Sequence, residues 1–438
     1  MVHQYKNNGY NIVLDVCSGS VHVVDDLVYD MIAMYKDKKF EEIEQAILEK
    51  YGDTYSKEDI KDAYSDISEL EEKELLFTED VFKDVIIDFK KRKTVVKALC
   101  LHIAHDCNLA CKYCFADEGE YHGQKRELMS LEVGKQAIDF LIENSGNRVN
   151  LEVDFFGGEP LMNFDVVKEI VAYGRSKEKA ANKNFRFTLT TNGMLLNDEV
   201  IDFCNREISN VVLSLDGRKE INDMMRPTRN GKGSYDIIVP KFQQREKFVE
   251  KRGDKSYYVR GTFTRNNLDF TKDFELMTEL GFKEISIEPV VTPDENDYAI
   301  REEDLPTIFE QYDKLAVDLI RRQKEGKPVT FFHYKLDLNG GPCVYKRLSG
   351  CGSGTEYLAV TPTGDLYPCH QFVGHDEFKL GDVFHGVERN DIVEEFKLCN
   401  VYAKDKCKDC FARFYCSGGC AANSYQFHGN ILDAYDVG

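Results

Sequence analysis

The sequence predicts an α/β protein with a partial (β/α)6 barrel in its middle, a small domain before it and a cysteine-rich domain after it. Two observations predict the barrel. Strand patterns alternate with amphipathic helix patterns over residues 98–326, and repeated βα units form a parallel sheet. Six such units suit an incomplete TIM-like barrel, whose active site lies at the carboxyl ends of the strands. A third observation, the crowding of cysteines over residues 327–438, predicts the last domain.

The composition argues against several classes of function. A formal charge of −20 on 438 residues disfavours nucleic acid as a partner, because phosphates attract Lys and Arg. The sequence has no run of ~20 apolar residues, which a membrane span would need. Its polar start lacks the apolar centre of a signal peptide. We therefore expect a cytoplasmic protein. Fourteen cysteines in such a chain indicate metal binding rather than disulfides.

Residues 1–80 predict a winged helix–turn–helix, because two strand patterns that suit a hairpin precede three helix patterns. The strands are Asn11–Val16 and Ser20–Val24, and the helices are Leu27–Tyr35, Phe40–Tyr51 and Lys57–Phe77. With 20 acidic residues, 8 Lys and no Arg, this segment should be repelled by DNA. Residues 81–97, which include the basic run 90–93, are predicted to be a linker.

The elements predicted for residues 98–326 follow one another in strand–helix order. The strands are Leu99–Ala104, Val149–Phe156, Phe185–Thr191, Asn210–Leu215, Tyr257–Phe263 and Glu284–Val290. The helices include Leu131–Asn144, Phe164–Ala172, Asp198–Arg206, Asp269–Leu280 and Leu305–Lys324. Motifs of chemical interest follow the first four strands. The carboxyl edge of the sheet is therefore the expected site.

Three cysteines follow the first predicted strand in the spacing Cys107-x3-Cys111-x2-Cys114. Thiolate is a soft ligand that favours iron–sulfur clusters or zinc. A four-iron cluster usually takes four thiolates, so three would leave one iron open to another ligand. Three buried cysteines, or a zinc knuckle without its last ligand, are the alternatives.

Glycines and short polar residues follow the next three strands. Gly157-Gly158-Glu159-Pro160 follows the second strand, and glycines allow a backbone to approach a ligand closely. Thr190-Thr191-Asn192-Gly193 follows the third, and Ser214-Leu215-Asp216-Gly217 follows the fourth. Their hydroxyl, amide and carboxylate groups can bind a polar cofactor. Ordinary turns are the alternative interpretation of each motif.

The C-terminal cysteines form two patterns. One is Cys351-x12-Gly364-x4-Cys369, in which residues 361–365 predict a hairpin turn. The other is Cys407-x2-Cys410-x5-Cys416-x3-Cys420. Such dense spacing indicates metal centres. A zinc ribbon is an alternative, because Cys407-x2-Cys410 alone would suit zinc.

The Cys107-x3-Cys111-x2-Cys114 motif, with the aromatic Tyr113 before its last cysteine, resembles the radical S-adenosylmethionine (SAM) superfamily. The resemblance implies a 4Fe–4S cluster whose open iron chelates the amino and carboxylate groups of SAM. It also implies that Arg226 pairs with the methionine carboxylate, which a guanidinium can bind through two N–H groups. Asp216 would lie nearer to the substrate. By position in the family's motifs, the cofactor-binding residues would be Tyr113, Gly157, Gly158, Glu159, Thr191, Asn192, Ser214 and Arg226.

The C-terminal patterns resemble the SPASM domain of radical SAM enzymes that modify peptides and proteins. The resemblance implies two auxiliary 4Fe–4S clusters. The ligands of the first would be Cys351, Cys369 and Cys420, with Cys343 as a candidate fourth, and those of the second would be Cys407, Cys410 and Cys416. The family pattern has one further cysteine, which this chain does not contain before Gly438. Either Cys399 substitutes for it or the native chain continues.

Over nearly its whole length the chain is similar to maturases of Cys-rich, SCIFF-type peptides, chiefly at residues 341–352 and 410–420. These enzymes form thioether crosslinks, as in sactipeptides. The resemblance implies hydrogen abstraction from an acceptor residue, expected to be Thr, followed by bonding of a cysteine sulfur to that carbon. Residues 1–80 resemble a peptide recognition element, which holds a leader peptide as an added strand. The implied partners are a Cys-rich precursor peptide and a low-potential electron donor such as flavodoxin or ferredoxin.

Two other functions compete with this one. Sulfatase-type maturases, which oxidise Ser or Cys, carry Asp at the position of His370. His can also accept a proton near neutral pH, so His370 and Asp216 are both candidate catalytic residues. The alternative from another class is a non-catalytic iron–sulfur electron carrier or peptide-binding scaffold. Such a protein would need no SAM.

Overall fold

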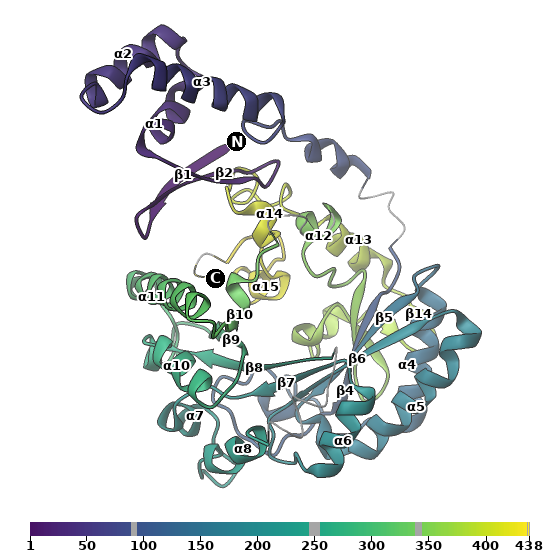
Figure 1. The fold of residues 1–438 in the computed structure, drawn as a ribbon. Helices are drawn as coiled ribbons and strands as arrows, with labels where there is room; N and C mark the ends of the chain where they lie inside the picture. Colours follow the sequence, from purple (N-terminus) through teal and green to yellow (C-terminus); the bar gives the residue numbers. More distant parts are fainter. Residues whose placement is uncertain (89–93, 245–254, 338–343, 436, 438) are drawn as a thin grey trace.

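The computed structural model describes residues 1–88, 94–244, 255–337, 344–435 and 437. They form a three-stranded antiparallel sheet and an eleven-stranded mixed sheet (Figure 1). None of the helices in these ranges combines the length and the apolar character that a membrane span requires.

Six parallel strands form the centre of the large sheet, and their order in the sheet is their order in the chain. They are β4 (Ala98–Ala104), β5 (Asn150–Gly157), β6 (Asn184–Thr191), β7 (Asn210–Ser214), β8 (Ser256–Phe263) and β9 (Glu284–Pro289). Each of the six predicted strands is confirmed to within a residue at either end. The α/β class with a parallel sheet is therefore confirmed.

Helices cover the outer face of the curved sheet (Figure 1). They are α4 (Leu131–Asn144), α5 (Phe164–Ala181), α6 (Asp198–Glu207), α7 (Lys219–Met225), α8 (Tyr235–Phe242), α10 (Thr271–Glu279) and α11 (Leu305–Lys324). The five predicted helices are confirmed, although α5 runs nine residues further than expected, to Ala181. The sequence did not predict α7 and α8, which are short; α8 also contains Pro240.

Side chains on each central strand alternate between the two faces, as the period of two requires. On β5, Leu151, Val153 and Phe155 are fully buried in the core beneath the helices. Asp154 and Phe156 point to the opposite face, inside the curved sheet. The inner face of the sheet therefore carries polar and aromatic side chains, whereas the outer face carries the apolar side chains of the core.

The large sheet continues into the cysteine-rich part of the chain. β11 (Tyr357–Val360) pairs parallel with β4 and antiparallel with β12 (Asp365–Tyr367), which confirms the predicted hairpin turn. The sheet ends with β13 (Gly381–Asp382) and β14 (Gly386–Val387), and β10 (Thr330–Phe331) extends its other edge beside β9. The expected boundary at residue 326 thus does not divide the sheet.

The first domain contains the predicted hairpin and three helices. Its elements are β1 (Val2–Asn7), β2 (Tyr10–Asp15), β3 (Val21–Val24), α1 (Asp26–Tyr35), α2 (Phe40–Tyr51) and α3 (Lys57–Glu72). The sequence did not predict β1, because its residues are mostly polar. The prediction that the third helix reaches Phe77 is wrong, since Glu74 adopts a φ of 56°, which a helix does not allow.

Shorter helices complete the described chain. A 3-10 helix, Val81–Asp88, occupies the start of the predicted linker, and the basic run 90–93 lies outside the described residues. The C-terminal part contains α12 (Val344–Ser349), α13 (Asn390–Leu398), α14 (Arg413–Cys416) and α15 (Ala421–His428).

The first domain rests on the cysteine-rich part of the chain (Figure 1). A small apolar cluster joins them; its buried members are Leu14, Val16, Cys17, Leu348, Val401 and Phe414. Beside this cluster, Arg413 forms an ion pair of 2.9 Å with Asp80, and only 3% and 12% of these two side chains is exposed. The Tyr402 hydroxyl donates a hydrogen bond of 2.7 Å to the same carboxylate. The contact between the first domain and the cysteine-rich part therefore has a buried ion pair at its centre.

We expect Arg413→Met to destabilise the protein by about 3 kcal/mol, because it leaves the Asp80 carboxylate buried without its cation. Urea unfolding followed by circular dichroism measures the change. Arg389→Met is the matched control, because its ion pair with Asp391 is exposed on both sides. An equal shift of the two unfolding midpoints would contradict a stabilising role for the buried pair.

Candidate functional site

The carboxyl ends of β4 to β7 surround a cavity of about 150 Å³. Its wall contains all three cysteines of the first motif, Cys107, Cys111 and Cys114. Seven of the eight predicted cofactor-binding residues also line it: Tyr113, Gly157, Gly158, Thr191, Asn192, Ser214 and Arg226. Residues more than a hundred positions apart in the sequence therefore meet in one wall.

The cysteine loop that follows β4 is held from two sides. On one side, the Glu159 N–H donates a hydrogen bond of 2.9 Å to the Asp106 carbonyl. On the other side, the Ala110 N–H donates one of 2.8 Å to the Pro227 carbonyl. The loop is thus fixed between the β5 loop and the segment that carries Arg226.

Gly157 and Gly158 allow the cysteine loop to approach β5. A Cβ atom on Gly158 would lie 2.1 Å from the Asp106 carbonyl oxygen, and one on Gly157 would lie 2.4 Å from that of Ala104. Gly157 also has a φ of 117°, a conformation that favours glycine. Any larger residue at either position would push the cysteine loop away from the cavity.

Glu159 is fully buried and does not line the cavity. One carboxylate oxygen accepts hydrogen bonds from the Thr191 hydroxyl (2.8 Å) and the Leu161 N–H (3.0 Å), and the other accepts one from the Asn192 N–H (2.8 Å). Burial raises the pKa of Glu159 to about 6, although these donors act against the shift. The side chain positions Thr191 and Asn192. Its contact with the cofactor stays a prediction.

Asp216 is also fully buried, beneath Tyr113 and Arg226. The Tyr113 hydroxyl donates to its carboxylate at 2.7 Å and accepts a hydrogen bond of 2.9 Å from the Arg226 guanidinium. The Thr262 N–H donates to the same carboxylate at 3.0 Å. Burial raises the pKa of Asp216, while the charge of Arg226 opposes the rise. The Asp216 carboxylate holds Tyr113 and, through it, Arg226. Its position near the substrate stays a prediction.

Arg226 lines the cavity, and one of its buried donors has no partner among the described residues. The side chain is buried, and its Nε atom has no hydrogen-bond partner among the described residues. A guanidinium with a free N–H suits a carboxylate ligand. Opposite groups are also polar: the Asn192 amide donates to the Asn108 side chain at 2.7 Å and lies 3.6 Å from the Cys107 sulfur.

His370 lies beside the same cavity. Its ring centre is 5.3 Å from that of Phe115 and 5.2 Å from that of Phe156, and both phenyl rings line the wall. Its Nδ1 atom shares a hydrogen bond of 3.2 Å with the Tyr357 hydroxyl. Burial lowers the pKa of His370 to about 4, so the imidazole is neutral and weakly basic at pH 7.

Several of the C-terminal cysteines lie close enough to act on one another's pKa. Burial and the nearby thiols of Cys420 and Cys351 raise the pKa of Cys369. Burial also raises the pKa of Cys407, together with the thiols of Cys416 and Cys410. Cys343, the candidate fourth ligand of the first group, lies outside the described residues.

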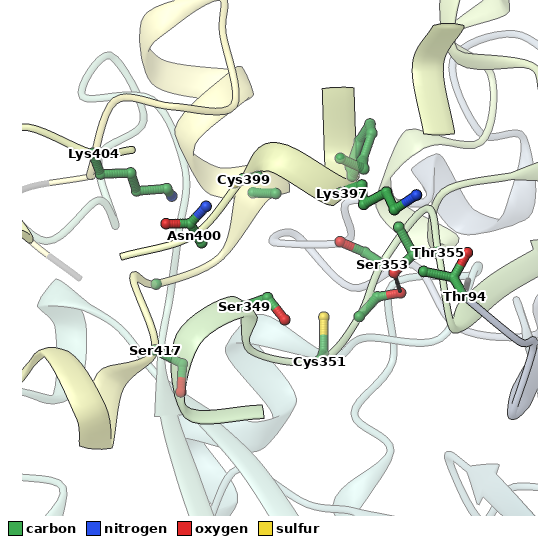
Figure 2. A pocket seen from close by; sticks show the side chains of 14 residues that line it. Thr94, Ser349, Cys351, Ser353, Thr355, Lys397, Cys399, Asn400, Lys404 and Ser417 are labelled. Atoms are coloured by element: carbon green, nitrogen blue, oxygen red, sulfur yellow. Dashed lines mark hydrogen bonds between the residues drawn. The ribbon is translucent and has the colours of Figure 1, made fainter. Parts of the chain in front are cut away.

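A second cavity, of about 30 Å³, contains Cys351 and Cys399 in its wall (Figure 2). All thirteen described cysteines are free thiols. In the described part of the chain, no three Cys, His, Asp or Glu side chains converge as ligands of a single metal ion. In a four-iron cluster each thiolate binds a different iron, so its ligands need not converge on one point.

The sequence did not single out three residues that complete these sites. Phe156 lines the first cavity, and its position directly before Gly157 was a usable signal. Asn108 bonds to Asn192 from inside the cysteine loop. Lys404, which lines the second cavity, had no signal, because nothing in the pattern around it indicates that its ammonium is buried.

Residues 101–242 match the model of the Radical SAM superfamily. An uncharacterised protein of Methanocaldococcus jannaschii is 28% identical over 73% of this chain and 96% of its own. A cysteine-type anaerobic sulfatase-maturating enzyme of Clostridium novyi is 24% identical over 73% of this chain and 86% of its own. The structure of Streptococcus suis SuiB bound to precursor peptide SuiA is 15% identical, with a TM-score of 0.56 over 99% of this chain and 97% of SuiB.

The matched segment contains the cysteine loop, the β5 loop and Arg226, which form most of the first cavity. A radical SAM domain implies SAM and a 4Fe–4S cluster as cofactors. The residues present fit both groups. Three thiols share one wall, the Arg226 Nε donor is unused, and Phe115 and Phe156 offer aromatic surface.

Affinity for SAM should fall as pH falls through about 6, because protonation of Glu159 turns one of its acceptor oxygens into a donor. The carboxylate then no longer accepts from both Thr191 and Asn192. Anaerobic equilibrium dialysis between pH 5 and 8 measures the dissociation constant.

Glu159→Gln should bind SAM about tenfold more weakly at pH 8, since its amide nitrogen opposes a donor at a cost of ~1–3 kcal/mol. The variant should also lack the step near pH 6. Glu207→Gln, on the outer end of α6, is the control and should behave as the unmodified protein does. A pH step that persists in Glu159→Gln would contradict this role.

Proposed function

We propose that this chain, whose residues 101–242 form a radical SAM domain, installs thioether crosslinks in a ribosomally made Cys-rich peptide. A cysteine sulfur of the peptide would be joined to a carbon of an acceptor residue, expected to be Thr. The 5′-deoxyadenosyl radical would take the hydrogen of the C–H bond, the cysteine thiol would lose its proton, and the surplus electron would leave through an auxiliary cluster. The observation that carries the proposal is the adjacency of two centres. The cavity with Cys107, Cys111 and Cys114 meets the first C-terminal cysteine group at His370, the residue after Cys369.

In this proposal Cys107, Cys111 and Cys114 hold the 4Fe–4S cluster, and Arg226 binds the carboxylate of SAM. When bound, the cluster supplies the electron that splits SAM and yields a 5′-deoxyadenosyl radical able to abstract hydrogen. Tyr113 and Asp216 keep the Arg226 guanidinium in place from behind. Positioned donors of this kind bind a cofactor without first having to reorganise.

The polar end of the β6 and β7 strands would hold the rest of SAM. Thr191, Asn192 and Ser214 line the wall with hydroxyl and amide groups that suit a ribose. Phe115 and Phe156 would exclude water from the reacting atoms. Glu159 keeps Thr191 and Asn192 in register with the cysteine loop, because it accepts hydrogen bonds from both.

A peptide substrate is supported by the relatives. The Clostridium novyi relative is named a cysteine-type anaerobic sulfatase-maturating enzyme, and the structure of SuiB contains its precursor peptide SuiA. In the first domain β3 is an outer strand of the sheet, and β2 is its strand partner. Val21 and Val23 on β3 are 39% and 64% exposed, whereas β1 lies against the C-terminal part, where His3 stacks on Phe411. A leader peptide would therefore add to β3.

The two C-terminal cysteine groups would hold auxiliary 4Fe–4S clusters. Cys351, Cys369 and Cys420 would ligate the first, with Cys343 as its fourth ligand. Cys407, Cys410 and Cys416 would ligate the second, for which Cys399 is the candidate fourth ligand. A flavodoxin or ferredoxin would supply electrons to the chain.

Sulfatase-type oxidation is the second candidate, because the Clostridium novyi relative carries that name. The residue after Cys369 argues against it. His370 has a pKa of about 4, so it is a weaker base at pH 7 than an ordinary His. The assay that separates the two functions is the product: a thioether joins two residues of the peptide, whereas the sulfatase-type reaction oxidises one.

Cys111→Ala should abolish formation of 5′-deoxyadenosine, because one of three thiolates of the SAM-binding cluster is lost. Chromatography after anaerobic reduction with SAM measures the product. Cys204→Ala is the control: Cys204 is buried in α6, away from the cavity, and that variant should keep cleavage. Cleavage that persists in Cys111→Ala would contradict the ligand assignment.

Val23→Asp should weaken binding of the leader peptide at least tenfold, because a charge on the outer strand opposes an added strand of apolar character. Uncoupled SAM cleavage should be unchanged. Isothermal titration calorimetry with the leader measures the affinity. Val317→Asp on α11, a Val that is 52% exposed, is the control for an added surface charge. Equal affinity of both variants for the leader would refute the role of β3.

A further inference from the structure

A buried lysine lies between the two groups of C-terminal cysteines. The Lys404 side chain is 2% exposed. Its ammonium donates to the Gly418 carbonyl at 2.8 Å and to the Ser424 hydroxyl at 3.3 Å, and both partners are neutral. No carboxylate in the described ranges forms an ion pair with it. Burying a charge costs free energy of folding unless an opposite charge compensates it. We therefore expect an anion beside this ammonium.

Cysteines of both groups lie close to Lys404. Cys399 lines the same cavity, and the Cys407 N–H donates to the Lys404 carbonyl. Cys420 lies two residues after Gly418, whose carbonyl accepts from the ammonium. Cys420 belongs to the first cysteine group and Cys407 to the second. A single ammonium therefore faces both groups.

The backbone around Lys404 fixes the position of its charge. The Gly418 carbonyl that it binds lies between Cys416 and Cys420 in the chain. The Cys407 N–H donates a hydrogen bond of 2.9 Å to the Lys404 carbonyl. The Ser424 hydroxyl, the second partner of the ammonium, also donates to the Cys420 carbonyl at 3.0 Å. The lysine thus joins the loops that carry cysteines of both groups.

The same side chain borders a small cavity. Lys404 lines this cavity, of about 30 Å³, together with Cys351 and Cys399 (Figure 2). A negatively charged group held by the cysteines at this cavity would face the ammonium directly. In a medium of low dielectric, such an attraction is much stronger than in water.

We propose that Lys404 is the fixed counter-charge of both C-terminal cysteine centres and raises the reduction potentials of the clusters they hold. The inference rests on the proposed auxiliary clusters. Reduction of such a cluster adds one electron to a group that thiolates already make negative, so a nearby cation stabilises the reduced form more than the oxidised form. Lys404 acts through the clusters and need not touch a substrate.

The test is a potentiometric titration of the full chain, monitored by electron paramagnetic resonance, with Cys107, Cys111 and Cys114 changed to Ala. That background leaves the C-terminal centres as the only proposed clusters. Lys404→Met and Lys404→Gln remove the charge, whereas Lys404→Arg keeps it. Lys408→Met is the matched control, because Lys408 follows Cys407 directly but pairs with Asp405 on an exposed surface.

We expect Lys404→Met and Lys404→Gln to lower the midpoint potentials of both centres, while Lys404→Arg and Lys408→Met stay close to the unmodified background. Loss of C-terminal iron in the two uncharged variants, with retention in Lys404→Arg, would equally support a counter-charge. Unchanged potentials in Lys404→Met and Lys404→Gln would overturn the proposal. The same shift or the same loss of iron in Lys404→Arg would overturn it too, since the role would then be structural.

The iron content of the background protein separates this proposal from the function on which it rests. C-terminal iron in that protein, with potentials insensitive to Lys404, would overturn the counter-charge alone. Absence of C-terminal iron in the protein with Lys404 intact would overturn the auxiliary clusters, and the counter-charge with them.

Discussion

The contact between the cysteine loop and the β5 loop is the constraint on which the site depends. Gly158 lets the Asp106 carbonyl approach to a distance that no side chain would allow, and the next residue, Glu159, binds that carbonyl through its N–H. The Glu159 carboxylate then reaches Thr191 and Asn192 at the end of β6. One short segment thus sets the relative positions of three βα loops. That segment therefore determines the shape of the cavity that the three loops line.

Buried charged groups also fix the relative positions of segments elsewhere in the chain. Asp216 holds Arg226 through the Tyr113 hydroxyl, and Arg413 joins the first domain to the cysteine-rich part through Asp80. Each of these charges has a partner in the described structure. Lys404 differs, because its partners there are neutral. This contrast is the reason to expect an anionic group beside it when the chain is complete with its cofactors.

Much of this architecture could be predicted because it depends on local pattern. The six central strands and five of their helices follow from periodicity. Long-range pairing could not be predicted: nothing in the sequence showed that β11 would join β4. Burial of polar groups was missed for the same reason. Glu159 and Asp216 have the residue types of ligands, but only the fold shows that their carboxylates serve other side chains.

The central claim is that one chain combines a SAM-cleaving centre with two further clusters. The most direct measurement is anaerobic: iron and sulfide per chain, followed by reduction with SAM and quantification of 5′-deoxyadenosine. The account predicts cleavage with about twelve irons per chain, the sum of three four-iron clusters. About four irons with cleavage would contradict the C-terminal clusters and the thioether chemistry. Zinc without cleavage would contradict the enzyme as a whole.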